Sequence, residues 1–298
     1  MSGSALAFIG LGEAATSIAT GLGEEGLAGI LAFDCDQSNP ARRQVIEKRA
    51  ANSGVTLVGS LEDLITRSDI IISSVTSSVA VEVAEAAAAH LSERHIYVDL
   101  NSTSPEVKIG IGQTIEPTGA RFVEAAVMAA VPPFKQKVPM LLCGPAAPDV
   151  IAALAPFGMD LEDFGPELGR AAATKMFRSI VVKGLEALLQ ECVLGADRYG
   201  VADRVLDSVE TGYPGIDWKK LTSYLMGRTA IHGERRAHEM EEVAATLRSL
   251  NIEPLMAEAA GRRIAWGGSQ GLKDVFGDQA PESYKDVLKA LNAKRADP

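Results

Sequence analysis

Ala5-Leu-Ala-Phe-Ile-Gly-Leu-Gly-Glu-Ala-Ala15 reads as an apolar strand that runs into the pattern Gly10-x-Gly12-x-x-Ala15 and then into a helix. The next apolar strand, Leu31-Ala-Phe-Asp34, ends on an acid. Such a glycine pattern is common by chance, but here it lies between a strand and a helix, in a unit of about 30 residues. The stretch therefore predicts a βαβ unit that binds a dinucleotide, rather than a glycine-rich turn in an ordinary α/β protein.

The small residues of this loop have separate tasks. Gly10 permits the tight turn, Gly12 lets the backbone approach a pyrophosphate, and Ala15 allows close packing of helix on strand. N–H groups at the helix start bind the phosphate charge, and Asp34 accepts hydrogen bonds from a ribose. Three more loop residues, and three residues at later strand ends that face the nicotinamide, complete the predicted cofactor contacts: Leu11, Glu13, Ala14, Val75, Thr76 and Asn101.

The end of the second strand also bears on the choice of cofactor. Asp34 and Asp36 would repel the 2′-phosphate of NADP, so the sequence predicts NAD. Arg42 and Arg43 follow closely and leave NADP open, because an arginine near this acid can accommodate a 2′-phosphate.

Composition excludes several classes of protein. The 298 residues carry 39 acidic and 29 basic side chains, a net charge of −10, which argues against nucleic acid or an anionic membrane as a partner. No apolar run approaches the roughly 20 residues that span a bilayer. Cys35, Cys143 and Cys192 have neither a disulfide nor a metal-ligand spacing. We therefore expect no metal, and a cytoplasmic location.

Short apolar runs alternate with helical stretches over residues 1–165, which predicts a Rossmann-type, doubly wound, mostly parallel sheet. Further strands are expected at residues 55–58, 69–75, 96–99, 121–127 and 139–143. Strand signals then stop, and residues 166–298 are expected to form an all-helical domain for substrate binding and dimerisation. Its helices are expected at residues 169–195, 202–211, 218–231, 235–250, 255–266 and 281–293.

The first of these helices carries a narrow polar stripe. Lys175, Arg178, Ser179, Lys183 and Glu186 fall within about 140° of its circumference, between apolar residues. A solvated face is the simpler explanation, but a narrow stripe on a mostly apolar helix favours a cleft. Burial beside two other cations would lower the pKa of Lys175 toward a value useful for proton transfer.

A second row of charges lies on a later helix. Arg228, His232, Arg235, Glu239 and Glu242 recur at spacings of three and four. Alternating charges at this spacing are typical of an exposed, salt-bridged face. Alternatively, part of the row closes over a substrate, with an arginine binding a carboxylate or phosphate through two parallel hydrogen bonds. The sequence leaves both interpretations open.

The pattern of the chain resembles the β-hydroxyacid dehydrogenase and 6-phosphogluconate dehydrogenase superfamily over essentially its whole length, and three segments carry the resemblance. They are Phe8-Ile-Gly-Leu-Gly12, Tyr97-Val-Asp-Leu-Asn-Ser-Thr-Ser-Pro105 and Gly169-x5-Lys175. The resemblance implies that Lys175 is the general acid/base. It also implies which residues of this chain correspond to the substrate-binding residues of the family. They are Ser102, Met128, Ala129, Arg178, Ser179, Arg235 and His238.

The chain also departs from the superfamily at the substrate residues. Met128 stands where a serine usually holds the substrate, and Arg178-Ser179 replace a pair of asparagines. His238-Glu239 stands where a Lys-Asp pair is usual. The helical half is more similar to a divergent branch whose C-terminal domain is of unknown function. A hydroxy-acid substrate is thus an implication of the resemblance alone.

The leading hypothesis is an NAD(P)-dependent oxidoreductase that transfers a hydride between nicotinamide and a small hydroxy acid or related alcohol, with Lys175 exchanging the hydroxyl proton. A reductase of imines or bulky ketones is the first alternative, favoured by the altered substrate loop. A dinucleotide-binding sensor without turnover is the second.

A homodimer is also expected. The helical half carries apolar side chains that about 130 residues without a sheet would bury poorly alone, and proteins of the superfamily commonly pair through this domain. The side chains expected to be exposed are Tyr213, Trp218, Leu221, Tyr224, Leu225 and Met226.

Overall fold

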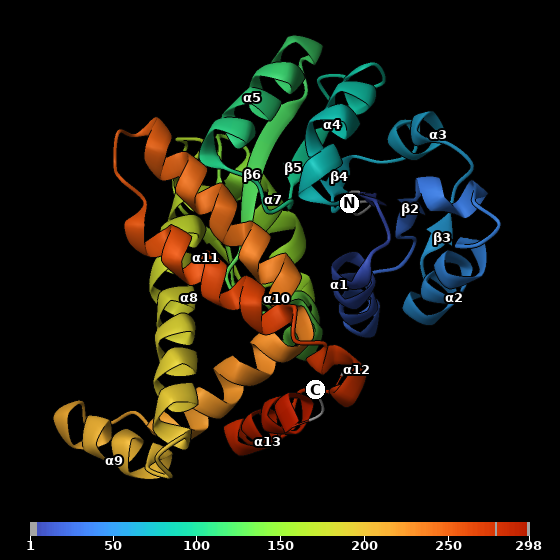
Figure 1. Ribbon diagram of the computed structural model, residues 1–298. Coiled ribbons are helices and arrows are strands. Elements are labelled where there is room, and N and C mark those ends of the chain that lie inside the picture. Colours follow the sequence, from blue (N-terminus) through green and yellow to red (C-terminus); the bar gives the residue numbers. More distant parts are fainter. Residues whose placement is uncertain (1–4, 278, 297–298) are drawn as a thin grey trace. The chain divides into compact units, whose positions relative to one another are not determined.

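The computed structural model describes residues 5–277 and 279–296. The chain divides into two compact units, residues 1–175 and 176–298, and all described strands belong to the first (Figure 1). The helix α8 (Arg170–Asp197) leads from the first unit into the second. The domain boundary expected from the sequence, after residue 165, lies just before this helix.

The first unit is built on a sheet with the strand order β3-β2-β1-β4-β5-β6-β7-β8. Neighbouring strands are parallel, except for the antiparallel pair β6 and β7. An order that reverses at β1 is that of the Rossmann fold, so the predicted doubly wound, mostly parallel sheet is confirmed. The strands are β1 (Leu6–Ile9), β2 (Leu31–Phe33), β3 (Thr56–Leu57), β4 (Ile70–Ser73), β5 (Ile96–Asp99), β6 (Arg121–Val127), β7 (Met140–Cys143) and β8 (Leu161–Asp163).

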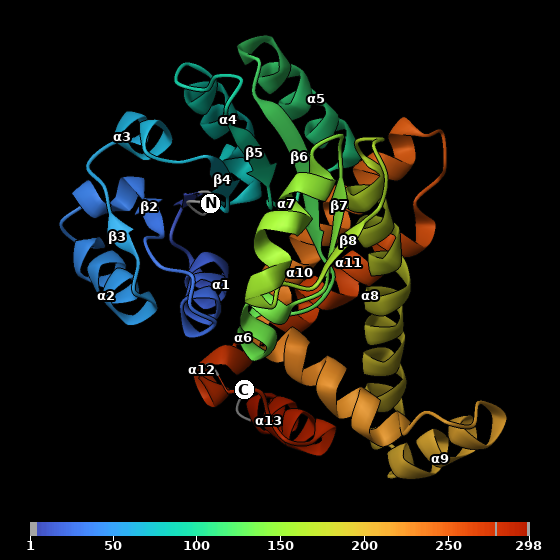
Figure 2. The ribbon, with the colours of Figure 1, turned by 180° about the vertical axis from the view of Figure 1, so that it is seen from behind.

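Helices cover both faces of this sheet (Figures 1 and 2). One face packs against α1 (Glu13–Glu24), α2 (Arg43–Ser53) and α7 (Ala147–Leu154), and the other against α3 (Leu61–Thr66), α4 (Ala80–Ala88) and α5 (Pro105–Ile115). Side chains alternate along a strand, so the neighbours Ile71 and Ile72 belong to different cores. A short helix, α6 (Val131–Phe134), follows β6.

The second unit is helical, as expected. Its core collects apolar residues such as Trp218, Met226 and Tyr284, and a second cluster gathers around Met240. After α8, its helices are α9 (Ala202–Gly212), α10 (Trp218–Ser249), α11 (Leu255–Gly268), α12 (Leu272–Phe276) and α13 (Tyr284–Ala296). In the described ranges, no helix combines the length and apolarity that crossing a membrane requires.

One long helix replaces two that the sequence predicts. The expected helices 218–231 and 235–250 form the single helix α10, which bends at His232, where φ is −125° and ψ is 17°. The next residue, Gly233, lies against α11 so closely that a Cβ there would be 2.6 Å from the Cα of Gly268. Close helix packing therefore accommodates the bend without ending the helix.

The expected exposure of apolar side chains in this unit is only partly correct. Tyr213 and Tyr224 are exposed, but Trp218, Leu225 and Met226 are buried. These three pack into the core that α13 completes, so the expectation is wrong for them. Leu221 is half-buried against the same core.

Candidate functional site

The glycine loop after β1 has the backbone that a phosphate-binding turn requires. Gly10 has a φ of +87°, and a Cβ there would lie 2.5 Å from the carbonyl oxygen of Ser74, so no other residue fits. Gly12, the residue before α1, has open space where a Cβ would be. No side chain caps the start of α1, which leaves its first N–H groups to bind an anion. Ala15 is fully buried, as its predicted packing role requires.

Asp34 is held against this loop. Its Oδ2 accepts a hydrogen bond from the backbone N–H of Leu11 at 2.8 Å, and its Oδ1 accepts one from Asp36 at 3.0 Å. Each carboxylate oxygen has a second lone pair for a ribose hydroxyl. Arg42 forms an ion pair with Asp36, with Nε and Oδ2 2.8 Å apart, and Arg43 pairs with Glu47. The residues present therefore fit a dinucleotide.

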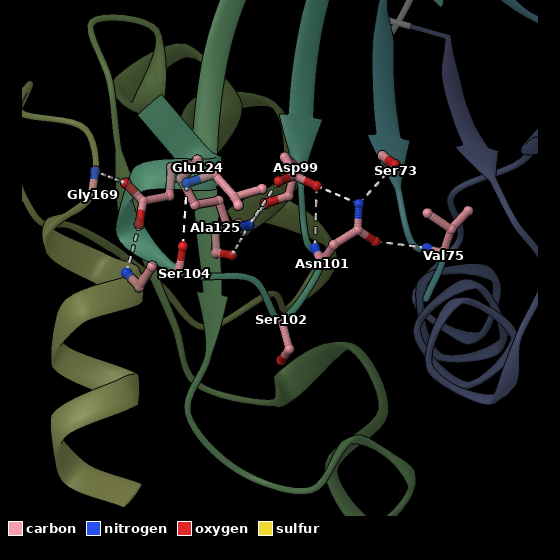
Figure 3. Close-up of polar contacts among 12 residues, drawn as sticks. Ser73, Val75, Asp99, Asn101, Ser102, Ser104, Glu124, Ala125 and Gly169 are labelled. Atoms are coloured by element: carbon pink, nitrogen blue, oxygen red, sulfur yellow. Dashed lines mark hydrogen bonds and ion pairs between the residues drawn. The ribbon is translucent and has the colours of Figure 1, made fainter. Parts of the chain in front are cut away.

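Asn101 ties together two strand ends at the carboxyl edge of the sheet (Figure 3). Its Oδ1 accepts a hydrogen bond from Val75 N at 2.7 Å, and its Nδ2 donates to Ser73 Oγ at 3.0 Å and Asp99 Oδ1 at 2.5 Å. Ser73 ends β4 and Asp99 ends β5. This amide therefore fixes the backbone that leads from β4 to the exposed Thr76.

A buried lysine on α5 holds the carboxylate of Asp99 in position. Lys108 of α5 is 1% exposed, and its Nζ lies 2.9 Å from Asp99 Oδ2. The same ammonium donates to the carbonyl oxygens of Asp99, at 2.7 Å, and Ala125, at 3.4 Å. It thus orients the carboxylate that in turn holds Asn101. No local sequence pattern marks Lys108 as functional, although it is the one charged residue on the buried side of α5.

Glu124 of β6 connects the same edge to α8 (Figure 3). Its fully buried carboxylate accepts hydrogen bonds from Gly169 N and Ala172 N, both at 2.5 Å. Burial raises the pKa of Glu124, whereas the two N–H groups and the charge of Lys108 lower it. An acid beside the first N–H groups of a helix caps it and complements its dipole. Glu124 therefore fixes where α8 begins.

Lys175 lies shortly after this cap, and its Nζ donates a hydrogen bond to Ser102 Oγ at 2.5 Å. Ser102 follows Asn101 directly and is exposed. Two segments that the sequence analysis singled out separately, around Asn101 and around Lys175, therefore meet in the first unit. The contact puts an ammonium and a hydroxyl side by side at the end of the sheet where open α/β folds bind ligands.

The remaining predicted substrate residues have different surroundings. Met128 is half-buried against a small core of Ala126, Leu141, Cys143 and Ala171, and Ala129 is exposed. The other four belong to the second unit. Arg178 is exposed, Ser179 is half-buried, Arg235 pairs with Glu239, and His238 pairs with Glu241.

The polar stripe on α8 does not face a cleft along its whole length. Lys183 and Glu186 are 4% and 0% exposed and pair with Glu239 and Arg236 inside the helical unit. The cleft interpretation is wrong for these two residues, because a buried charge needs a paired partner rather than water. In the part of the chain that the structure describes, no group of three or more His, Cys, Asp or Glu is placed to hold a metal ion.

Two families match separate parts of the chain. Residues 5–103 match the family described as NADP oxidoreductase coenzyme F420-dependent, and residues 196–266 match a domain of unknown function, DUF1932. With the glycine loop and Asp34, the first match makes the chain a dehydrogenase or reductase that uses a nicotinamide dinucleotide.

Similar solved structures cover nearly the whole chain. A conserved hypothetical protein from Sinorhizobium meliloti 1021 is 39% identical, with a TM-score of 0.78 over 98% of this chain and 96% of that one. The conserved protein MTH1747, of unknown function and described as structurally similar to 3-hydroxyacid dehydrogenases, is 32% identical, with a TM-score of 0.73 over 90% of this chain and 96% of that one. The chain belongs to the family of these two proteins, a branch of the 3-hydroxyacid dehydrogenase-like oxidoreductases with a helical C-terminal domain of unknown function.

A 3-hydroxyisobutyrate dehydrogenase from Mycobacterium tuberculosis, solved with L-serine, has the same fold. It is 17% identical, with a TM-score of 0.72 over 97% of this chain and 99% of that one. The superfamily resemblance noted from the sequence is thus confirmed at the level of the fold.

Proposed function

We propose that this protein transfers a hydride between a nicotinamide dinucleotide and a small hydroxy acid or a related alcohol, with Lys175 as general acid/base. The hydrogen bond between Lys175 Nζ and Ser102 Oγ, at 2.5 Å, carries the proposal. An oxidoreductase of alcohols needs a group that exchanges the hydroxyl proton and a second group that orients the oxygen. A lysine beside a serine supplies both.

The residues of the first unit divide these tasks. The loop from Gly10 to Ala15 binds the pyrophosphate, and Asp34 binds a ribose hydroxyl. The bound nicotinamide supplies or accepts the hydride. In the oxidative direction neutral Lys175 takes the proton from the substrate hydroxyl, and in the reductive direction its ammonium returns it. Ser102 bonds the same oxygen and restricts the position of the lysine.

The substrate contacts form the finer part of the proposal. We assign them to Ser102, Met128, Ala129, Arg178, Ser179, Arg235 and His238. The half-buried Met128 offers an apolar surface where the superfamily has a serine. That change also supports the alternative of a reductase for imines or bulky ketones.

A substrate screen tests the proposal. Hydroxy acids, sugar acids and aryl alcohols are incubated with NAD and with NADP, and the absorbance of the reduced nicotinamide is followed. Oxidation of a hydroxy acid or related alcohol is the expected result. Turnover restricted to ketones with an added amine would replace the proposal by the imine-reductase alternative. Cofactor binding without any turnover across the screen would identify a sensor.

NAD is expected to bind more tightly than NADP. Asp34 and Asp36 would repel a 2′-phosphate, and Arg42, which could attract one, forms an ion pair with Asp36. Fluorescence titration with NADH and NADPH measures both dissociation constants. Because Arg42 is paired with Asp36, Arg42→Ala should change neither dissociation constant by more than a few-fold. Tighter binding of NADPH than of NADH would contradict the assignment.

We propose a homodimer in the cytoplasm. The cysteines Cys35, Cys143 and Cys192 are free thiols, which suits a reducing compartment. Exposed apolar residues of the helical unit, among them Val181 and Leu188 of α8, support a partner subunit. Light scattering at low micromolar concentration is expected to give twice the chain mass of 31.4 kDa. A mass equal to one chain would refute the dimer.

A further inference from the structure

A cluster of charges surrounds the bend in α10, entirely within the helical unit. Its members come from α8 and α10, and four of them are cations while two are carboxylates. They are Lys183, Arg228, Arg235, Arg236, Glu186 and Glu239. Positive charge therefore exceeds negative charge in a partly buried region, where water screens it poorly.

The first carboxylate, that of Glu186, is fully engaged. Arg236 donates from Nε to Glu186 Oε1 at 3.1 Å and from Nη2 to Oε2. The hydroxyl of Thr229 also donates to Oε1. Burial opposes the charge on Arg236, but the hydrogen bonds and charge of Glu186 leave its pKa raised. The pair is a bidentate salt bridge, so the hydrogen bonds of Glu186 go to Arg236 and Thr229, and Arg228 receives only the more distant attraction of its charge.

The second carboxylate, that of Glu239, is engaged by two other cations. Its Oε2 accepts a hydrogen bond from Lys183 Nζ at 2.5 Å, and its Oε1 accepts one from Arg235 Nη1 at 2.5 Å. Lys183 is 4% exposed, whereas Arg235 lies near the surface. Glu239 thus shares its single charge between two cations and offers none to Arg228.

Arg228 is the cation of this cluster that forms a salt bridge with neither Glu186 nor Glu239 among the described contacts. Its Nε is buried and has no hydrogen-bond partner among the residues that the structure describes. Burial lowers the pKa of the Arg228 guanidinium, and the charges of Arg236 and Arg235 lower it further. A buried donor without an acceptor, next to like charges, costs free energy that an anion would recover.

The packing of α10 holds this cluster in place. The bend at His232 separates Arg228 from Arg235 and Arg236 along the helix. Gly233 fixes the bend, because its Cα region lies directly against Gly268 of α11. The backbone positions that carry the three arginines are therefore set before any ligand arrives, which lowers the entropic cost of binding.

We propose that Arg228 is the primary contact of a binding site for an oxyanion, the carboxylate or phosphate group of a small molecule. A guanidinium presents two parallel N–H groups that match two oxygens of either group. Arg228 is half-buried as a whole, so its terminal Nη groups would donate these bonds, and Arg235 at the surface adds attraction. The site lies within the helical unit and shares Arg235 with the proposed substrate contacts, but the binding of an anion is measured without hydride transfer.

Anion titrations of the full-length protein test this site. Inorganic phosphate and malonate are titrated calorimetrically at constant ionic strength, adjusted with sodium chloride. The unsubstituted protein is expected to bind at one site per chain, and the tighter of the two probes identifies the preferred oxyanion. Arg228→Met should weaken binding about 10- to 100-fold, because charge-assisted hydrogen bonds are lost.

Two further variants keep the test decisive. Arg262→Met removes a highly exposed arginine of α11 that lies 4.0 Å from Glu258, and it should bind as the unsubstituted protein does. Arg228→Lys retains the charge but not the planar pair of donors, so it should bind with intermediate affinity even if the methionine variant fails to fold. Equal affinities for Arg228→Lys, Arg262→Met and the unsubstituted protein would overturn the proposal, as would no binding of either probe.

Discussion

Lys175→Ala is expected to lower kcat by about 10²-fold or more, since general acid–base catalysis contributes about 10²–10⁴. The dissociation constant for the cofactor should stay nearly unchanged, because we assign cofactor binding to the loop from Gly10 to Ala15 and to Asp34. Cofactor titration and steady-state kinetics on the substrate that the screen identifies separate these two effects. A loss in kcat with intact cofactor binding is the signature of a proton-transfer group.

Two control variants sharpen this prediction. Thr174→Ala alters the preceding residue, which is exposed and whose hydroxyl donates to the carbonyl of Arg170 in its own helix, and it should leave kcat unchanged. Lys175→Arg keeps a positive charge beside Ser102, but a guanidinium does not release its proton at working pH. It should therefore be as inactive as the alanine variant. An active arginine variant would reassign Lys175 to electrostatic anchoring of the substrate.

The sequence predicts the N-terminal fold well because the determining features are local. The turn at Gly10 needs a positive φ, and the pattern around it fixes a strand and a helix within a few residues. The buried strands read as continuous β-branched runs such as Ile70–Ser73. Neither the reversed direction of β7 nor the short strand β8 leaves a comparable pattern. Their pairing depends on contacts between distant segments.

The candidate site is predicted only in part, for a similar reason. Lys175 and Asn101 lie in recognisable segments, but their connection runs through Glu124 and Lys108, which no local pattern marks as functional. The available signal is a charge where a buried face should be apolar. Glu124 interrupts the apolar strand β6, and Lys108 interrupts the inner face of α5. Such residues indicate a buried ion pair, but the sequence does not show which charges pair.

Lys108→Met is expected to destabilise the protein by about 3–5 kcal/mol, because it leaves a buried charge without its partner. Lys108 is 1% exposed and Asp99 is 0% exposed, and Lys108 Nζ lies 2.9 Å from Asp99 Oδ2. Urea unfolding of the full-length protein measures the change. Lys48→Met, at an exposed position of α2, is the matched control and should stay within about 0.5 kcal/mol.

The pH dependence of the Lys108→Met defect distinguishes lost charge compensation from lost packing. Burial raises the pKa of Glu124, and the charge of Lys108 is one of the influences that lower it. Without the lysine, the pKa of Glu124 in the folded protein rises further above its unfolded value. A group with a raised folded pKa stabilises the fold below its unfolded pKa, and this contribution disappears as the pH rises through the folded pKa. The deficit of the variant should therefore shrink when unfolding is measured at mildly acidic rather than neutral pH.

Adding Asp99→Asn to Lys108→Met should recover part of the stability at neutral pH, because the second buried charge is then gone. A deficit that is independent of pH and is not reduced in the double variant would assign Lys108 to packing alone.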